Sequence, residues 1–151
     1  MRIIANLAQL SSLVGHEVAV SGWIRIDQQR IDAFAAATGD TQWIHVDAAR
    51  AASESPYRST IAHGFLTLAL LPYFFREAMR IDGIRMVVNY GVNRVRFPAP
   101  VRTGSNLRAR FRLAQLTAID DSVQIEWHVD IECEGTAKPV CVAESLIRYY
   151  R

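Results

Sequence analysis

The chain has 151 residues, half of them hydrophobic, which suits one domain over residues 1–151 with a sizeable buried core. Seventeen Lys and Arg residues against 15 Asp and Glu residues give a net charge of +2, too small to indicate nucleic acid or a membrane surface as a partner. The N-terminus lacks a signal-peptide layout, and the longest uncharged run, residues 61–75, is too short to span a membrane. We therefore expect a cytoplasmic protein.

The first 26 residues predict one short helix and one strand. Residues 3–14 are expected to form the helix, which ends at Gly15. Residues 18–26, which read VAVSGWIRI, have the composition of a strand.

A second helix is predicted over residues 28–38, where apolar side chains recur at helical spacing. Asp27 is a suitable N-cap, and Gly39 supplies the stop. The stretch TGDTQWIHVD therefore begins at the C-terminal end of this helix. Another short helix is expected to begin after Asp47, which can cap it.

Residues 61–80 are the most apolar part of the chain. Past Gly64 they are apolar on every side for almost three turns, and a helix of this kind is buried on all sides. Pro72 removes a helical hydrogen bond, so we expect a kink between Leu68 and Pro72. The rest of the chain has to wrap this helix.

The C-terminal half supplies that covering as strands. They are predicted over residues 84–97, 106–116, 122–132 and 139–149. Apolar and polar side chains alternate along the middle two, and Asp120-Asp121 marks the hairpin turn between them. Long strands with one apolar face form an antiparallel sheet covered on one side. We therefore predict an α+β hot-dog fold, in which a long central helix is wrapped by a curved antiparallel β-sheet.

The polar face of the strand over residues 106–116 carries Arg108, Arg110 and Arg112. Such a stripe is compatible with a phosphorylated ligand. The adjacent strand offers acidic groups on its own polar face, so cross-strand ion pairs explain both stripes better. Cys133 and Cys141 lie in apolar strands without a C-x-x-C spacing, which predicts two reduced, buried thiols.

Asp40 and His45 are the first candidates for chemistry. They stand five positions apart, with Trp43 between them, in a stretch apolar enough to be partly buried. A partly buried acid beside an imidazole is a common arrangement for proton transfer near neutral pH. The alternative is an aspartate that only hydrogen-bonds its own backbone, beside a surface histidine.

His63 and Gly64 form the second candidate, at the start of the buried helix. The first N–H groups of a helix have no partner inside it, and the helix dipole favours negative charge there. Since glycine lets a ligand approach the backbone, the Gly64 N–H is suited to an oxyanion hole for a carbonyl or thioester oxygen. An ordinary turn glycine is the alternative.

The sequence also contains residues that could form a metal site or a nucleophilic site. His45, Asp47 and His63 supply the two histidines and one carboxylate of non-haem iron sites, but a helix stands where those sites need strands. No G-x-S-x-G motif is present. We expect neither a metal nor a nucleophilic Ser or Cys.

Three segments in order resemble the MaoC-like hydratases, also called R-specific enoyl-CoA hydratases, and most closely their NodN-like branch. They are AAATGDTQWIHVDAARA at 35–51, IAHGF at 61–65 and VRFPAPV at 95–101. The resemblance covers about residue 23 to the end. It implies a hot-dog fold, usually as a homodimer in which two sheets join into one.

The resemblance also implies a reaction, the reversible addition of water to trans-2-enoyl-CoA to give (R)-3-hydroxyacyl-CoA. Asp40 and His45 would hold and activate the water, and the Gly64 amide, beside His63, would bind the thioester oxygen. Which of the two groups is the base stays open. No metal or redox cofactor is expected, because hydration needs only a base, an acid and donors for the oxyanion. CoA, or an acyl carrier protein, enters as part of the substrate.

This chain departs from the family pattern at two places. Many members have Asn-Pro between the acid and the histidine, where Gln42-Trp43 stands here, and some place a serine where Pro72 stands. The hydrogen-bond partner of Asp40 is therefore open. The replacement candidates are Gln42, Asn89, Tyr90 and Asn93. We also expect the substrate to contact His63, Gln42, Trp43, Asn89 and Tyr90, beside Gly64. The kink at Pro72 is expected to shape the acyl tunnel.

Two other functions remain open from the sequence. A hot-dog thioesterase would use the same helix start but direct water at the carbonyl carbon. A non-catalytic acyl-thioester binding module would need no Asp40/His45 pair. The basic residues Arg58, Arg94 and Arg96 are candidates for the CoA phosphates or plain solvated charges.

Overall fold

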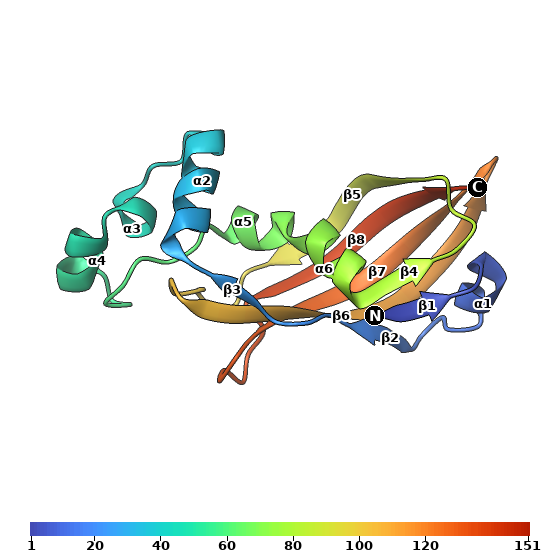
Figure 1. The fold of residues 1–151 in the computed structure, drawn as a ribbon, viewed down its shortest axis with the longest axis horizontal. Helices are drawn as coiled ribbons and strands as arrows, with labels where there is room; N and C mark the ends of the chain where they lie inside the picture. The colour runs from blue at the N-terminus through green and yellow to red at the C-terminus, as the bar shows by residue number, and fades with distance from the viewer.

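The computed structural model describes residues 1–151 and is built on one curved antiparallel sheet (Figure 1). Its strands are β2 (Glu17–Val20), β3 (Ile24–Ile26), β5 (Met86–Arg96), β6 (Ser105–Ile119), β7 (Ser122–Cys133) and β8 (Cys141–Tyr150). The order across the sheet is β2-β6-β7-β8-β5, and β3 also pairs with β6. A pair of short helices packs against its concave side, which confirms the predicted hot-dog fold.

The predicted central helix is interrupted. α5 (Gly64–Ala69) ends at Leu70, and α6 (Leu71–Ala78) begins directly after it. Pro72 lies in the first turn of α6, where its missing N–H is not needed by the helix. The predicted kink between Leu68 and Pro72 is confirmed.

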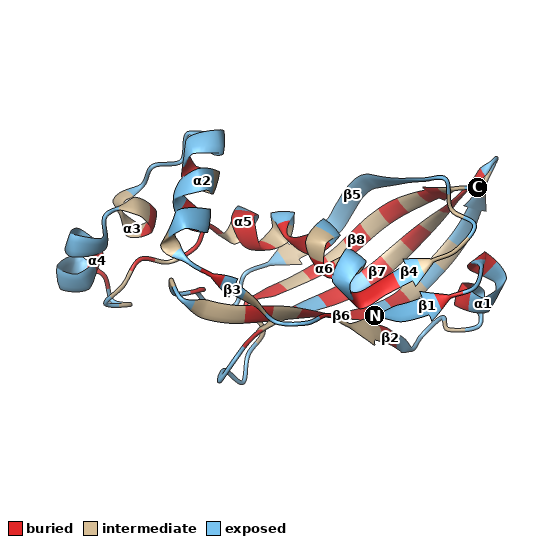
Figure 2. Ribbon diagram, in the orientation of Figure 1, coloured by how far each residue is buried: buried red, intermediate tan, exposed pale blue.

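The apolar composition predicts that this helix pair is buried on every side. This prediction is wrong for the single chain. Leu66 and Phe74 pack into the core, but Phe65 is 70% exposed. Pro72 is exposed as well. The sheet covers one side of the helices only, so the other side stays open (Figure 2).

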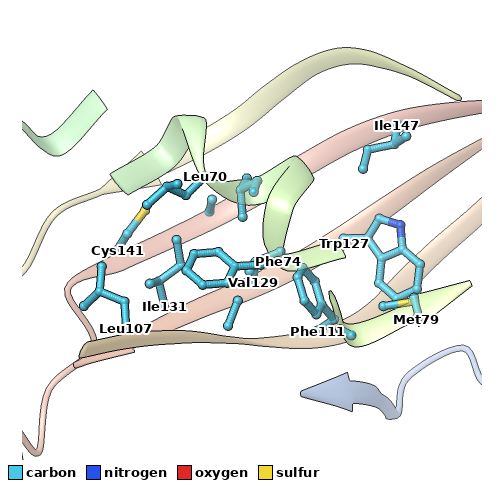
Figure 3. Close-up of a cluster of buried hydrophobic side chains, with 14 of the residues drawn as sticks. Leu70, Phe74, Met79, Leu107, Phe111, Trp127, Val129, Ile131, Cys141 and Ile147 are labelled. Carbon is cyan, nitrogen blue, oxygen red and sulfur yellow. The ribbon is translucent and has the colours of Figure 1, made fainter. Parts of the chain in front are cut away.

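The core fills the space between the helix pair and the inward side chains of β6, β7 and β8 (Figure 3). The alternation read from the sequence is confirmed, since Leu107, Phe111, Trp127 and Ile131 are fully buried. Phe75 brings its ring to 4.2 Å from that of Phe111. Cys133 and Cys141 are free thiols and buried, as predicted.

The outer face of the sheet carries ion pairs between neighbouring strands. Arg108 Nε lies 2.7 Å from Glu132 Oε2, and Arg110 Nη2 lies 2.8 Å from Glu17 Oε2. The interpretation of the arginine stripe as a solvated, ion-paired face is therefore confirmed for these two residues.

Three helices gather at one end of the molecule, beside the start of α5 (Figure 1). α2 (Gln28–Thr38) is capped by Asp27, whose side chain accepts the Arg30 N–H, and ends at Gly39 in the left-handed region. α4 (Ala48–Glu54) is capped by Asp47. Both predicted helices are confirmed, whereas α3 (Trp43–Val46), between them, was not predicted.

The N-terminal prediction is only partly right. β1 (Arg2–Ile4) precedes α1 (Leu7–Ser11), so the helix is shorter than expected. β1 pairs in parallel with β4 (Met79–Ile81), which follows α6. The predicted strand over residues 18–26 is divided into β2 and β3. None of the helices combines the length and apolar character needed to cross a bilayer.

Candidate active site

An acid and two imidazoles meet at the end of the molecule where the three small helices lie. Gly39 adopts φ 77°, ends α2 and turns the chain so that Asp40 follows in a loop. His45 lies in α3, and His63 is the N-cap residue of α5. A carboxylate oxygen of Asp40 and one ring nitrogen of each histidine lie within 4.8 Å of one another.

Two hydrogen bonds hold His45, one at its ring and one at its backbone carbonyl. Its Nδ1 lies 2.7 Å from the carbonyl oxygen of Ile61. Because a carbonyl can only accept, Nδ1 carries the hydrogen and Nε2 of the neutral ring is left with a lone pair. The His45 carbonyl in turn accepts a hydrogen bond of 2.7 Å from Gln28 Nε2. His45 can therefore accept a proton at Nε2.

The carboxylate of Asp40 is 54% exposed and weakly held. Its Oδ1 accepts the backbone N–H of Gln42 at 3.4 Å. Among the four candidate partners, Gln42 thus supplies a contact, but through its backbone rather than its amide. Asn93 instead donates to Glu126 at 3.4 Å.

A cleft of about 340 Å³ opens in front of this cluster. His45, Gly64, Thr67 and Phe97 all contribute to its lining. A Cβ on Gly64 would stand 2.9 Å from the Phe97 ring, so a larger residue there requires this ring to shift. The sequence pattern predicts neither Phe97, which lies in the VRFPAPV segment, nor Thr67 as a residue of the site.

The other predicted binding residues do not line this cleft. His63 lies behind it, 3% exposed. Trp43 carries the Arg50 guanidinium 4.4 Å above its ring. Tyr90, in the edge strand β5, has the Arg148 guanidinium 3.7 Å above its ring. Asn89 faces a different cavity. Within one chain, Asn89 and Tyr90 are therefore not brought to Asp40.

A second cavity of about 430 Å³ lies beside α6. Pro72, Phe75, Met79 and Ile147 give it apolar walls, and Asn89 lies at its edge. It is larger than the cleft at His45, but neither an imidazole nor a carboxylate lines it. The Pro72 kink borders this cavity, and its role in an acyl tunnel stays a prediction.

The carboxylate beside the two histidines is not the one that the sequence pattern suggests for a metal site. Asp47 caps α4 by accepting the Arg50 N–H, so Asp40 takes its place beside the two histidines. The imidazoles of His45 and His63 stack at 3.8 Å with 26° between their planes. The Nε2 hydrogen of His63 is directed at the Asp40 carbonyl oxygen, so this nitrogen has no free lone pair for an ion.

Comparison with known proteins places this site in context. Residues 9–133 match the family described as MaoC like domain. The chain is 47% identical over 150 residues to 3-hydroxyacyl-thioester dehydratase Z of Mycobacterium tuberculosis, covering 99% of both chains. It is also 47% identical over 140 residues to Nodulation protein N of Rhizobium meliloti, covering 91% of this chain and 87% of that protein. The R-hydratase PhaJ1 of Pseudomonas aeruginosa shares the fold with a TM-score of 0.70 and 25% identity, over 91% of this chain and 82% of that one.

Proposed function

Because this chain belongs to the MaoC-like family of hydratases and dehydratases, we propose that it adds water reversibly to trans-2-enoyl thioesters to give (R)-3-hydroxyacyl thioesters. The observation that carries the proposal is that His45 lines the same cleft as Gly64 while a carboxylate oxygen of Asp40, which is not itself in the lining, lies within 4.8 Å of a His45 ring nitrogen. The two groups supply proton acceptors at the place where a helix start offers a free N–H.

The proposed reaction begins with a water between Asp40 and His45. The carboxylate and the bare Nε2 of His45 are both acceptors, so one water can donate a hydrogen to each. Its oxygen lone pair is then left to attack C3 of the enoyl group. Asp40 or His45 takes one proton as the C3–O bond forms, and that proton is delivered to C2.

The Gly64 N–H completes the proposed site. As water attacks C3, negative charge moves to the thioester oxygen. A backbone N–H at the start of α5 stabilises this charge, and the absence of a side chain at Gly64 keeps the approach open. The chemistry as proposed uses no metal or redox cofactor. The CoA or acyl carrier portion belongs to the substrate.

We also propose a homodimer. β5 has a hydrogen-bonded neighbour, β8, on one side only. Its exposed apolar residues are Met86, Val87, Val88, Tyr90 and Val92. A long apolar edge of this kind pairs readily with another strand. Antiparallel pairing of two β5 strands would join two sheets into one and cover the open side of the helix pair.

The proposed activity is tested by incubating the protein with enoyl-CoA substrates of increasing chain length and determining the chirality of the product. We expect hydration to the (R)-3-hydroxyacyl product without release of free CoA thiol. Release of the thiol would show a thioesterase. Saturable binding without turnover would show a binding module, and an (S) product would overturn the stereochemical assignment.

A further inference from the structure

His63 does not behave as a helix cap, although it occupies the N-cap position of α5. Its side chain makes no capping hydrogen bond to the helix. The ring turns back into the protein, where Nε2 lies 2.9 Å from the backbone carbonyl oxygen of Asp40. Since the carbonyl accepts, Nε2 carries the hydrogen. The other ring nitrogen, Nδ1, is buried without a partner.

The ring of His63 is also held on both faces. On one side it stacks on His45, with centroids 3.8 Å apart. On the other side Phe34 of α2 packs at 5.1 Å with a tilt of 52°. One side chain from the start of α5 thus touches α2, α3 and the loop after Gly39.

This contact matters because little else fixes Asp40. The carboxylate is half exposed, and its one side-chain hydrogen bond, to the Gln42 N–H, is long at 3.4 Å. His63 is bonded through its Nε2–H to the backbone of this loop, and the same nitrogen lies 3.9 Å from Oδ2 of the Asp40 carboxylate. His63 is nearly fully buried and does not line the cleft, so it has no surface with which to meet a substrate.

We propose that His63 is a positioning residue, which sets the Asp40 carboxylate in register with the His45 imidazole by one hydrogen bond and one ring stack. This inference rests on the proposed hydration. It gives His63 a role different from the substrate contact expected from the sequence. A displacement of about 1 Å between reacting groups can cost about 10²-fold in rate, so the effect of losing His63 is measurable.

Two variants separate the hydrogen bond from the stack. His63→Phe keeps a flat ring against His45 but loses the donor to the Asp40 carbonyl. His63→Gln keeps an N–H donor at a similar reach but loses the ring. We expect His63→Phe to lower kcat for enoyl-thioester hydration by about 10²-fold with little change in KM. His63→Gln should restore most of the rate. His128→Gln, on the exposed outer face beside Glu126, is the matched control.

Three kinetic outcomes would overturn the proposal. His63→Phe could keep the parent kcat, or it could raise KM with kcat unchanged, which would make His63 a substrate contact. His63→Gln could also lose as much rate as His63→Phe, which would remove the hydrogen bond from the explanation.

Measurements that need no turnover decide the case even if His63→Phe folds poorly. Histidine-selective NMR of the unmodified protein should find the ring hydrogen of His63 on Nε2 and that of His45 on Nδ1. Backbone relaxation should show residues 39–42 as rigid as α2 in the parent and in His63→Gln, which keeps the donor, and more mobile in His63→Phe. A hydrogen on Nδ1 of His63, or an unchanged loop, would reject the positioning role. A parent protein that hydrates no enoyl thioester would instead reject the proposed function and leave the loop result standing.

Discussion

The imidazole of His45 stacks on that of His63 at 3.8 Å, although one residue belongs to α3 and the other to the start of α5. Each ring donates its hydrogen to a backbone carbonyl, His45 to Ile61 and His63 to Asp40. The stack therefore joins two segments that the sequence separates. Through His63 it therefore connects Asp40 and His45, the two proton-transfer groups of the proposed reaction.

Asp40→Asn or His45→Gln should lower kcat by about 10²–10⁴-fold, the usual cost of losing a general acid–base group. The fold should survive the first change, because the Asp40 side chain is half exposed and weakly bonded. Steady-state kinetics and thermal unfolding measure both effects. Asp47→Ala is the matched control. It removes the cap of α4, which costs about 0.5–2 kcal/mol of stability, and should leave kcat unchanged. Near-normal kcat in Asp40→Asn would remove Asp40 from the mechanism.

Gly64→Ala should destabilise the protein and abolish hydration, because the added Cβ stands 2.9 Å from the Phe97 ring. Overpacking of this kind typically costs about 1–3 kcal/mol. Adding Phe97→Leu should recover stability, as followed by thermal unfolding against Phe97→Leu alone. If Gly64→Ala unfolds at the parent temperature, the two residues do not compete for this space.

Val92→Glu should dissociate the proposed homodimer. Val92 pairs with Ser145, which is buried, so it shares the concave face of the sheet, yet 46% of its surface is exposed in the single chain. Sedimentation velocity should show a dimer for the parent and a monomer for the variant. Val88→Glu is the comparison: Val88 belongs to the same edge strand but pairs with Arg148 and lies on the opposite face, away from the helix pair, so it should weaken the dimer less. Equal dissociation by both substitutions, or by neither, would contradict pairing through this face.

Pro72→Ala should alter preference for acyl length rather than the chemical step. The proline stands at the break between α5 and α6 and borders the larger apolar cavity, away from His45. We expect KM to change for long enoyl thioesters while kcat for the four-carbon substrate stays within about threefold, since the site of the chemistry is untouched. An equal change in KM for all chain lengths would show that the acyl chain does not occupy this cavity.

Stability should fall above about pH 9 in part through Cys141. Burial, helped by the negative charge of Asp130, raises the pKa of this thiol from 9.0 to about 12. The unfolded chain therefore loses the proton first. The contribution of the thiol to stability is fully present below about pH 9 and is lost as the pH rises towards about 12. Denaturant unfolding over this range should show a steeper loss in the parent than in Cys141→Ala. Parallel curves would contradict the assignment.

Much of the secondary structure followed from short-range signals. Asp27 and Gly39 bound α2 because a cap and a left-handed stop act on neighbouring backbone groups. The alternation along β6 and β7 identified the buried face because a strand has a period of two. Pro72 located the helix break for a similarly local reason, since the ring removes its own N–H.

The sequence by itself also pointed to Asp40, His45 and Gly64 and to the fold that brings them together. Only the tertiary structure decided how they are held. The inward turn of His63, the place of Phe97 over Gly64 and the parallel pairing of β1 with β4 all depend on segments distant in the chain. One side of α5 and α6 is exposed because the sheet covers only the other side. The apolar composition of the segment does not predict this. Such contacts arise from packing, in which a residue's neighbours in space, and not its neighbours in the sequence, fix its environment.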